Sequence, residues 1–119
     1  MIKLCDTREQ AIAITPDLLE KKNRPDGFFA INDETASGIL YACKLVGLKV
    51  PDEVSICGFT DGAIAQSTDP KLTTVDQHGQ EVGESAFEIL IGRLEGTSGE
   101  QKNNNRIVKT NLVVRGTTK

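Results

Sequence analysis

The chain has 119 residues, of which 38% are hydrophobic and 26% are charged, a composition typical of one globular domain or part of a larger one. This balance excludes collagen-like, low-complexity and wholly disordered chains. Fourteen Lys and Arg against 17 Asp and Glu give a formal net charge of −3, without the basic block that nucleic-acid binding by this chain needs. No apolar run is long enough to span a membrane, and no export signal opens the chain, so we expect a cytoplasmic protein with reduced thiols at Cys5, Cys43 and Cys57.

The first quarter of the chain predicts a strand followed by a helix. Residues 2–5 are a short apolar run, which predicts a strand. Thr7 and Gln10 have the spacing of a capping box, so a helix is predicted to begin there. Pro16 lies inside the apolar pattern of this helix, which predicts a kink at that point or a second helix start capped by Thr15.

Residues 28–60 predict a strand, a helix and a further strand. Residues 28–31 are consecutively apolar, as in a strand buried on both faces, and Gly47 is a stop signal for the helix that follows. The next strand is expected at residues 54–59. Two strands joined by one helix lie parallel with a right-handed crossover. With residues 2–5 the pattern becomes βαβαβ, so the predicted fold class is α/β, with a partial doubly wound parallel sheet.

The second half of the chain is predicted to add one strand, one long helix and short pieces of strand. Residues 62–71 are expected to be an irregular loop, and residues 72–75 a short strand. An amphipathic helix is predicted at about residues 80–94, followed by a polar loop at residues 97–105. Two apolar pieces, at residues 107–108 and 112–114, are expected to pair as a hairpin or to extend the sheet. The apolar stripe of the helix comprises Val82, Ala86, Phe87, Ile89, Leu90, Ile91 and Leu94.

Polar side chains follow two of the predicted strands. Asn32 and Asp33 come after the first buried strand, and Thr60 and Asp61 come after the next one. Ligands of doubly wound sheets bind beyond the carboxyl ends of the strands, so these side chains suit a polyhydroxylated or heterocyclic small molecule. Three alternatives stay open: helix capping for Asn32 and Asp33, a plain strand end for Thr60, and a turn beside Gly62 for Asp61.

The sequence gives little support for a metal site, a phosphate or dinucleotide site, or a catalytic nucleophile. His78 is the only histidine and has no Cys or second His near it, so a solvated or packing role is favoured over a metal site. The chain has no phosphate loop and no dinucleotide-binding fingerprint. Ser55, Ser67 and Ser85 lack the glycines of a nucleophile elbow. The sequence therefore predicts no catalytic residue, no metal and no cofactor.

An ordered set of motifs across residues 24–115 resembles the lactose and galactose repressor (LacI/GalR) family. Each motif alone is weak, but the set in this order is specific. Similarity to the family's consensus is found in RPDGFFAIND (residues 24–33), GLKVPDEVS (47–55), CGFTD (57–61), PKLTTVDQ (70–77) and LVVR (112–115).

The resemblance implies the effector-sensing part of a bacterial DNA-binding transcription regulator, with a periplasmic-binding-protein-like fold. Only about the last third of such a regulator is represented, without the helix-turn-helix that binds the operator. Residues 1–75 and 106–119 would form most of the C-terminal sub-domain, and residues 78–96 a helix of the N-terminal one. The implied partners are a second copy of the chain and a small-molecule effector, a sugar or sugar derivative. The alternatives are a periplasmic-type sugar receptor of a transporter and a small α/β enzyme.

The resemblance also places individual residues. Asn32, Thr60, Asp61 and Gln77 fall at effector contacts, although Thr60 replaces the first Asp of the family's pair and offers one hydroxyl in place of a carboxylate. The implied dimer interface comprises Glu34, Thr35, Ser37, Gly38, Ile64, Ser67 and Thr68. The chain alone holds half a cleft, so we expect weak effector binding at most, no DNA binding, and self-association through the stripe of residues 80–94.

Overall fold

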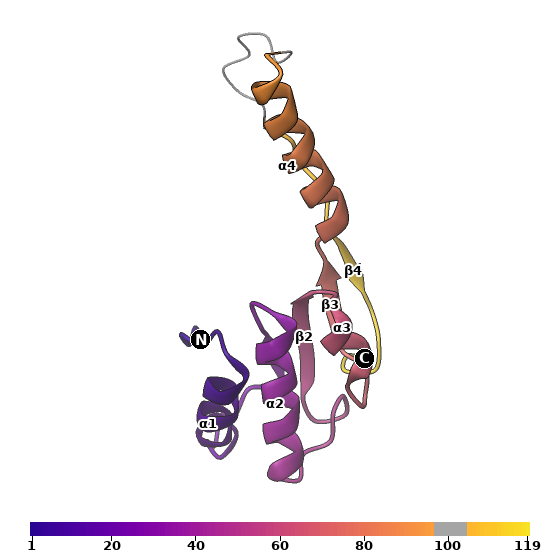
Figure 1. The fold of residues 1–119 in the computed structure, drawn as a ribbon. Coiled ribbons are helices and arrows are strands. Elements are labelled where there is room, and N and C mark those ends of the chain that lie inside the picture. The colour runs from indigo at the N-terminus through magenta and orange to yellow at the C-terminus, as the bar shows by residue number, and fades with distance from the viewer. Residues whose placement is uncertain (97–104) are drawn as a thin grey trace.

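The computed structural model describes residues 1–96 and 105–119, which form one sheet with three helices packed beside it and a fourth projecting away (Figure 1). The four strands are β1 (Gly27–Phe29), β2 (Ser55–Thr60), β3 (Thr73–Asp76) and β4 (Asn111–Val113), adjacent in that order. β1, β2 and β3 are parallel, and β4 pairs antiparallel with β3. The predicted α/β class with a partial, mainly parallel sheet is confirmed, and residues 111–113 extend the sheet edge.

The first strand expected from the sequence is not formed. Residues 2–5 run beside β1 without ladder hydrogen bonds, and β1 is the outermost strand. Ile2 and Leu4 are 93% and 99% exposed, whereas Cys5 packs against the core and Met1 and Lys3 line a cavity, so only one face of this segment meets the body. The prediction of a strand there is wrong, because nothing in the described part of the chain covers the face of Ile2 and Leu4.

Helix α1 (Arg8–Leu19) begins at the predicted cap and runs without interruption through Pro16. The Thr7 hydroxyl accepts the Gln10 N–H at 3.3 Å, while the Gln10 side chain accepts the N–H of Asp6 at 3.1 Å. The capping contact from Thr7 is thus confirmed, with the reciprocal bond one residue earlier than in a standard capping box. A second helix start at Thr15 is wrong. Thr15 is buried within the helix, and burial of this face outweighs the hydrogen bond that proline cannot donate.

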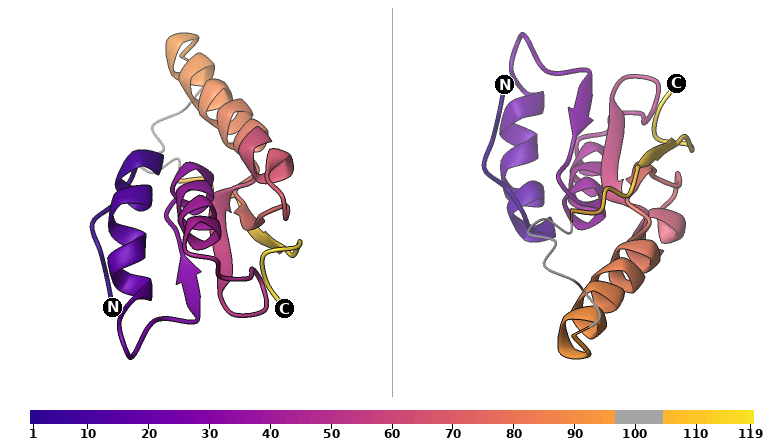
Figure 2. Two further views of the ribbon diagram at one scale, coloured as in Figure 1. Left: turned by 90° about the horizontal axis from the view of Figure 1, so that it is seen from below. Right: turned by 90° about the horizontal axis from the view of Figure 1, so that it is seen from above.

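Helix α2 (Asp33–Leu45) lies beside α1 and packs against β2, and both helices cover the same face (Figure 2). The Asn32 side chain caps its start, and Gly47, with φ of +76°, lies just beyond its end. Both signals are therefore confirmed. The core forms where α1 and α2 meet the sheet and comprises Ala11, Leu19, Ala30, Ala36, Ile39, Leu40, Cys43, Val54, Ile56, Ala65 and Leu72.

A short helix, α3 (Ala63–Ser67), occupies the segment predicted as an irregular loop. Its Ala65 is fully buried, and the Ala65 carbonyl accepts the N–H of Leu72 at 2.9 Å. The turn of helix forms because it places this small apolar residue in the core, a tertiary effect that local composition does not reveal.

The last residues close the sheet at its amino end. The Thr117 hydroxyl donates to the Ile56 carbonyl at 2.7 Å and accepts the Thr73 N–H at 2.8 Å. The Thr117 carbonyl accepts the N–H of Ile56 at 2.8 Å. One fully buried threonine thus links β2 to the start of β3, and we call this contact the Thr117 clasp.

Helix α4 (Gly79–Leu94) projects from the body, and the chain returns beside it towards β4 (Figure 1). None of the described residues of α4 is buried, and Phe87 and Leu94 are 63% and 74% exposed. Arg106, on the returning segment, pairs with Glu88 of the helix. Residues 107–108 form no strand, and residues 97–104 of the predicted polar loop lie outside the described part of the chain. No described helix combines the length and apolar character needed to cross a membrane.

Candidate functional site

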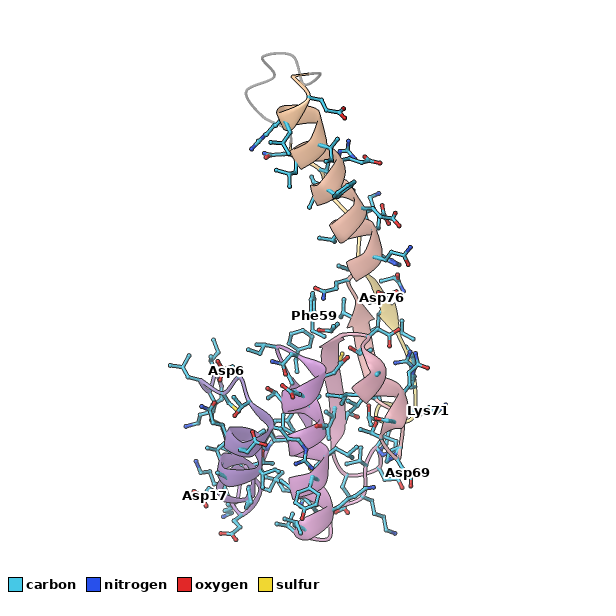
Figure 3. All side chains as sticks on the ribbon, viewed as in Figure 1. Asp6, Asp17, Phe59, Asp69, Lys71 and Asp76 are labelled. Carbon is cyan, nitrogen blue, oxygen red and sulfur yellow. The ribbon has the colours of Figure 1, made fainter. Side chains whose placement is uncertain are left out.

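Three predicted site residues lie at the carboxyl edge of the sheet. Asn32 follows β1, Thr60 ends β2 and Gln77 follows β3, and these strands are parallel neighbours. Thr60 stands opposite Asp76 in the ladder between β2 and β3. Figure 3 shows Asp76 at this end of the sheet, beside the base of α4. The topology therefore brings the polar groups of three strand ends to one rim, as the parallel arrangement requires.

Asn32 already makes two hydrogen bonds within the chain. Its Oδ1 accepts the N–H of Thr35 at 2.7 Å, which caps α2, and its Nδ2 donates to the Asp6 carbonyl at 3.0 Å. The capping interpretation is thus confirmed. A side-chain amide has two N–H donors and two lone pairs on its oxygen, so one N–H and one lone pair remain for a ligand.

Thr60 and Asp61 form a left-handed turn at the end of β2. Their φ angles are +133° and +57°, and positive φ is rare for non-glycine residues and strained for a β-branched one. Asp61 pairs with Arg115, with 2.7 Å between Oδ1 and Nη2, and the two side chains are only 15% and 16% exposed. One oxygen of the Asp61 carboxylate is therefore paired with a guanidinium, and the turn interpretation fits this residue.

Asp33 sits behind this turn as a buried carboxylate. Its Oδ2 accepts the N–H of Gly62 at 3.0 Å, and its Oδ1 accepts the Thr74 hydroxyl at 2.6 Å. A Cβ on Gly58 would lie 2.3 Å from Oδ1, so the strand approaches the carboxylate closely only because this residue is glycine. Burial, together with the negative charge of Asp33, raises the pKa of the Cys57 thiol on β2.

Asp76 and His78 shape the exit from β3 into α4. His78 has a φ of +51°, its N–H donates to Asp76 Oδ1 at 2.7 Å, and its Nδ1 lies 3.3 Å from Asp76 Oδ2. The imidazole therefore packs against a carboxylate at the junction of β3 and α4. Across residues 1–96 and 105–119, no three His, Cys, Asp or Glu side chains converge as metal ligands would.

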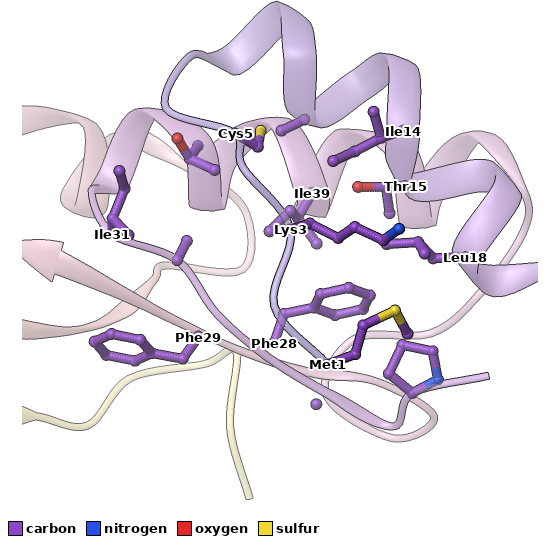
Figure 4. Close-up of a pocket in the computed structure, with 15 residues that line it drawn as sticks. Met1, Lys3, Cys5, Ile14, Thr15, Leu18, Phe28, Phe29, Ile31 and Ile39 are labelled. Atoms are coloured by element: carbon purple, nitrogen blue, oxygen red, sulfur yellow. The ribbon is translucent and has the colours of Figure 1, made fainter. Parts of the chain in front are cut away.

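A cavity of about 210 Å³ lies under α1, between residues 1–5, β1 and α2 (Figure 4). Its walls include Phe28, Ile39 and Leu18, and the Thr35 hydroxyl on its lining has no hydrogen-bond partner among the described residues. The cavity borders the N-terminal segment that fails to pair with β1. Its mainly apolar wall fits a packing gap better than a site for a polar ligand.

A shallow groove of about 350 Å³ separates α2 from α3. Five of the seven residues predicted at a dimer interface line it: Glu34, Ser37, Ile64, Ser67 and Thr68. The other two, Thr35 and Gly38, are buried within the chain, and a Cβ on Gly38 would lie 2.5 Å from the Arg8 carbonyl oxygen of α1. In this chain both residues belong to the contact between α2 and the neighbouring elements, and their place at a dimer interface stays a prediction.

The family model for the periplasmic binding protein-like domain matches residues 5–118, so the chain belongs to that family. A relative among curated proteins is the HTH-type transcriptional repressor PurR of Vibrio campbellii, 34% identical over 115 residues, which are 97% of this chain and 33% of the repressor. The chain therefore spans about one third of the length of that relative.

Two solved structures of LacI family transcriptional regulators share the fold. The regulator from Arthrobacter sp. FB24, in complex with lactose, has a TM-score of 0.87 and 30% identity over 96% of this chain and 43% of its own. The regulator from Enterococcus faecium, with bound ribose, has a TM-score of 0.84 and 27% identity over 94% of this chain and 40% of its own. The resemblance to LacI-type regulators predicted from the motifs is thereby confirmed.

Proposed function

We propose that this chain is the effector-sensing part of a bacterial LacI-type transcription regulator. The observation that carries the proposal is the carboxyl-edge rim of Asn32, Thr60 and Gln77 in a chain of this family. The relatives are named as repressors and transcriptional regulators, which favours a regulator over a transporter receptor or an enzyme. The proposed location of the intact protein is the cytoplasm.

The proposed effector is a neutral, polyhydroxylated molecule such as a sugar. The rim offers a hydroxyl from Thr60 and amides from Asn32 and Gln77, which donate and accept hydrogen bonds without charge. Asp61 pairs through Oδ1 with Arg115, which neutralises its charge, and its other carboxylate oxygen is the proposed effector contact. Two related regulators hold lactose and ribose, ligands of the chemical class that this rim suits.

The proposed arrangement in the intact regulator divides the chain between two sub-domains. Residues 1–75 and 106–119 form most of one sub-domain, and residues 78–96 supply a helix to the other. The exposed apolar side chains of α4 support this division, because a stripe of that size needs cover. Operator DNA would be bound by a headpiece outside this chain, and the effector would act by favouring one arrangement of the sub-domains.

The proposed homodimer surface is the groove between α2 and α3. Glu34, Ser37, Ile64, Ser67 and Thr68 line it together, from two elements that are separate in sequence. Tyr41 and Lys44 line the same groove and add an aromatic ring and a charge. The mixture of apolar and polar side chains is typical of interfaces between protein chains.

Nuclear magnetic resonance can test the site even if this chain binds sugars weakly. We expect millimolar ribose or lactose to shift the amide signals of Asn32, Thr60 and Gln77. The Thr60→Val variant keeps the shape of the residue and removes its hydroxyl, so the affinity should fall by about 2- to 10-fold, the value of one hydrogen bond. Thr68→Val is the matched control, because the Thr68 hydroxyl has no hydrogen-bond partner among the described residues. Thr68 precedes Asp69, which lies at the opposite end of the body from Asp76 (Figure 3), so this variant should leave the titration unchanged.

Two results would contradict this site. One is that neither sugar moves the rim signals, or that the shifts are confined to the cavity around Phe28. The other is an identical titration of the wild-type chain and Thr60→Val.

A further inference from the structure

We propose that Asp33 and Arg115 are positioning residues that hold the turn of residues 60–62 in the conformation that contacts the effector. The proposal rests on the proposed function, because it concerns the direction of the Thr60 hydroxyl at the same rim. Neither residue needs to touch the ligand, since each acts through the backbone or side chains of the turn.

The turn cannot rely on its own backbone preferences. Thr60 is β-branched and has a φ of +133°, and Asp61 follows at +57°. Two consecutive non-glycine residues at positive φ are each disfavoured, and such strain persists only where surrounding contacts impose it. The contacts that impose it must therefore reach the turn from outside β2.

Asp33 provides the first of these contacts from the start of α2. It is 4% exposed, and its two oxygens take the Gly62 N–H at 3.0 Å and the Thr74 hydroxyl at 2.6 Å. One carboxylate thus ties the end of the turn to β3. The first turn of a helix favours negative charge, which suits the position of Asp33. Gly58 leaves the space that the carboxylate needs, since a Cβ there would lie 2.3 Å from Oδ1.

Arg115 provides the second contact from the segment that follows β4. Its Nη2 lies 2.7 Å from Asp61 Oδ1, and its Nη1 donates to the Leu72 carbonyl at 3.0 Å. Its backbone N–H donates to the Thr73 hydroxyl at 2.8 Å, so the arginine is itself fixed at both ends. The guanidinium bridges the turn to the start of β3, a planar geometry that lysine cannot reproduce.

The contacts from Asp33 and Arg115, which we call the two anchors of the turn, matter because Thr60 offers a single hydroxyl. A carboxylate could grip two hydroxyls of a sugar from several directions, whereas one hydroxyl makes a hydrogen bond only within a narrow range of distance and angle. A small rotation of the turn would therefore remove the contact.

The experiment compares Arg115→Met and Asp33→Asn with Arg24→Met, a matched control at a half-exposed ion pair with Glu53. The HN–Hα couplings of Thr60 and Asp61 report φ directly, and hydrogen exchange reports the protection of the Gly62 amide. We expect both anchor variants to change the couplings and to speed exchange at Gly62. Affinity for ribose or lactose should fall by about 2- to 10-fold at most, the loss expected for Thr60→Val, because both residues act through that hydroxyl. Arg24→Met should change none of these, and Arg115→Lys should give an intermediate loss.

The outcomes separate this proposal from the proposed function. The proposal is overturned if folded Arg115→Met keeps the HN–Hα couplings of Thr60 and Asp61 and the exchange protection of Gly62. It is also overturned if the couplings change but the affinity for the sugar does not. If Asp33→Asn does not fold, Arg115→Met and Arg115→Lys decide the question, because their ion pair lies at the periphery of the core. A wild-type chain that binds neither sugar contradicts the proposed function, while its couplings still show whether the two residues hold the turn.

Discussion

Two helices of similar length, α2 and α4, differ in how far their side chains are buried. α2 has eight buried residues, among them Ala36, Ala42 and Cys43 at 0% exposure, whereas no described residue of α4 is buried. Both carry an apolar stripe. The difference shows that an amphipathic pattern specifies a helix and the direction of its apolar face, but the stabilising burial depends on a partner surface that the chain must also supply.

The body and α4 should therefore respond differently to the same substitution. Burying a large apolar side chain contributes roughly 1.5–3 kcal/mol to the free energy of unfolding. That contribution is present for the core under α2 and absent for the stripe of α4. Two pairs of measurements test this contrast, and a third measurement tests burial within α2 alone.

The largest effect is expected for Leu40→Ala in α2. Leu40 is 3% exposed, so truncation removes buried methyl groups and leaves a cavity, at a cost of about 2–5 kcal/mol. Leu90→Ala in α4 makes the same chemical change at a residue that is 54% exposed, and should stay within about 0.5 kcal/mol. Urea unfolding followed by circular dichroism measures both values. Equal losses would show that the α4 stripe is covered in solution.

A smaller contrast is expected between two glycines. Gly58→Ala places a methyl group against the buried carboxylate of Asp33, which should lower the free energy of unfolding by about 1–3 kcal/mol. Gly83 lies inside α4 with nothing within 4 Å of an added Cβ, so Gly83→Ala should raise it by about 0.5–1 kcal/mol. The same urea experiment gives the sign of each change. A stabilising Gly58→Ala would show that the carboxylate can move away freely.

The smallest effect is the pH dependence of the buried thiol in α2. Burial raises the pKa of Cys43 from 9.0 to about 11. As the pH rises, the thiol of the unfolded chain loses its proton before the thiol of the folded chain does. The contribution of Cys43 to the free energy of unfolding is therefore fully present below about pH 9 and is lost as the pH rises towards 11. The loss should be at most about 2 kcal/mol. The Cys43→Ala variant lacks this term, so its stability should fall less than that of the wild-type chain between about pH 8 and about pH 10.5. Parallel curves would mean that the thiol is not shielded from water.

The sequence predicted the elements whose signals are local. The capping residue Asn32 and the stop at Gly47 lie at the ends of the helix that they define, and both were confirmed. A strand forms at Gly27–Phe29, but its predicted burial on both faces is wrong: Phe29 and Ile31 are 66% and 60% exposed, because β1 is the outermost strand. The strand at residues 2–5 failed because strand formation depends on a neighbour and on cover, which an apolar run does not provide by itself.

The anchors of the site depend on residues that are far apart in the chain. Asp33 meets Thr74 across 41 positions, and Arg115 meets Asp61 across a long excursion through α4. Capping at the start of a helix explained Asp33 well enough that no buried network was expected. A local hint existed in Gly58, since a glycine inside a strand often marks the close approach of another group.

The Thr117 clasp has a consequence for the order in which the molecule can assemble. Its hydroxyl joins Ile56 and Thr73, which precede it by 61 and 44 positions. On the ribosome, β1, β2 and β3 emerge long before residue 117, and until then one carbonyl and two amide groups at the sheet's amino end must be hydrogen-bonded by water. The Thr117 clasp can therefore form only after α4 has been synthesised and residue 117 has reached the sheet. Completion of the amino end of the sheet is thus a late step in folding.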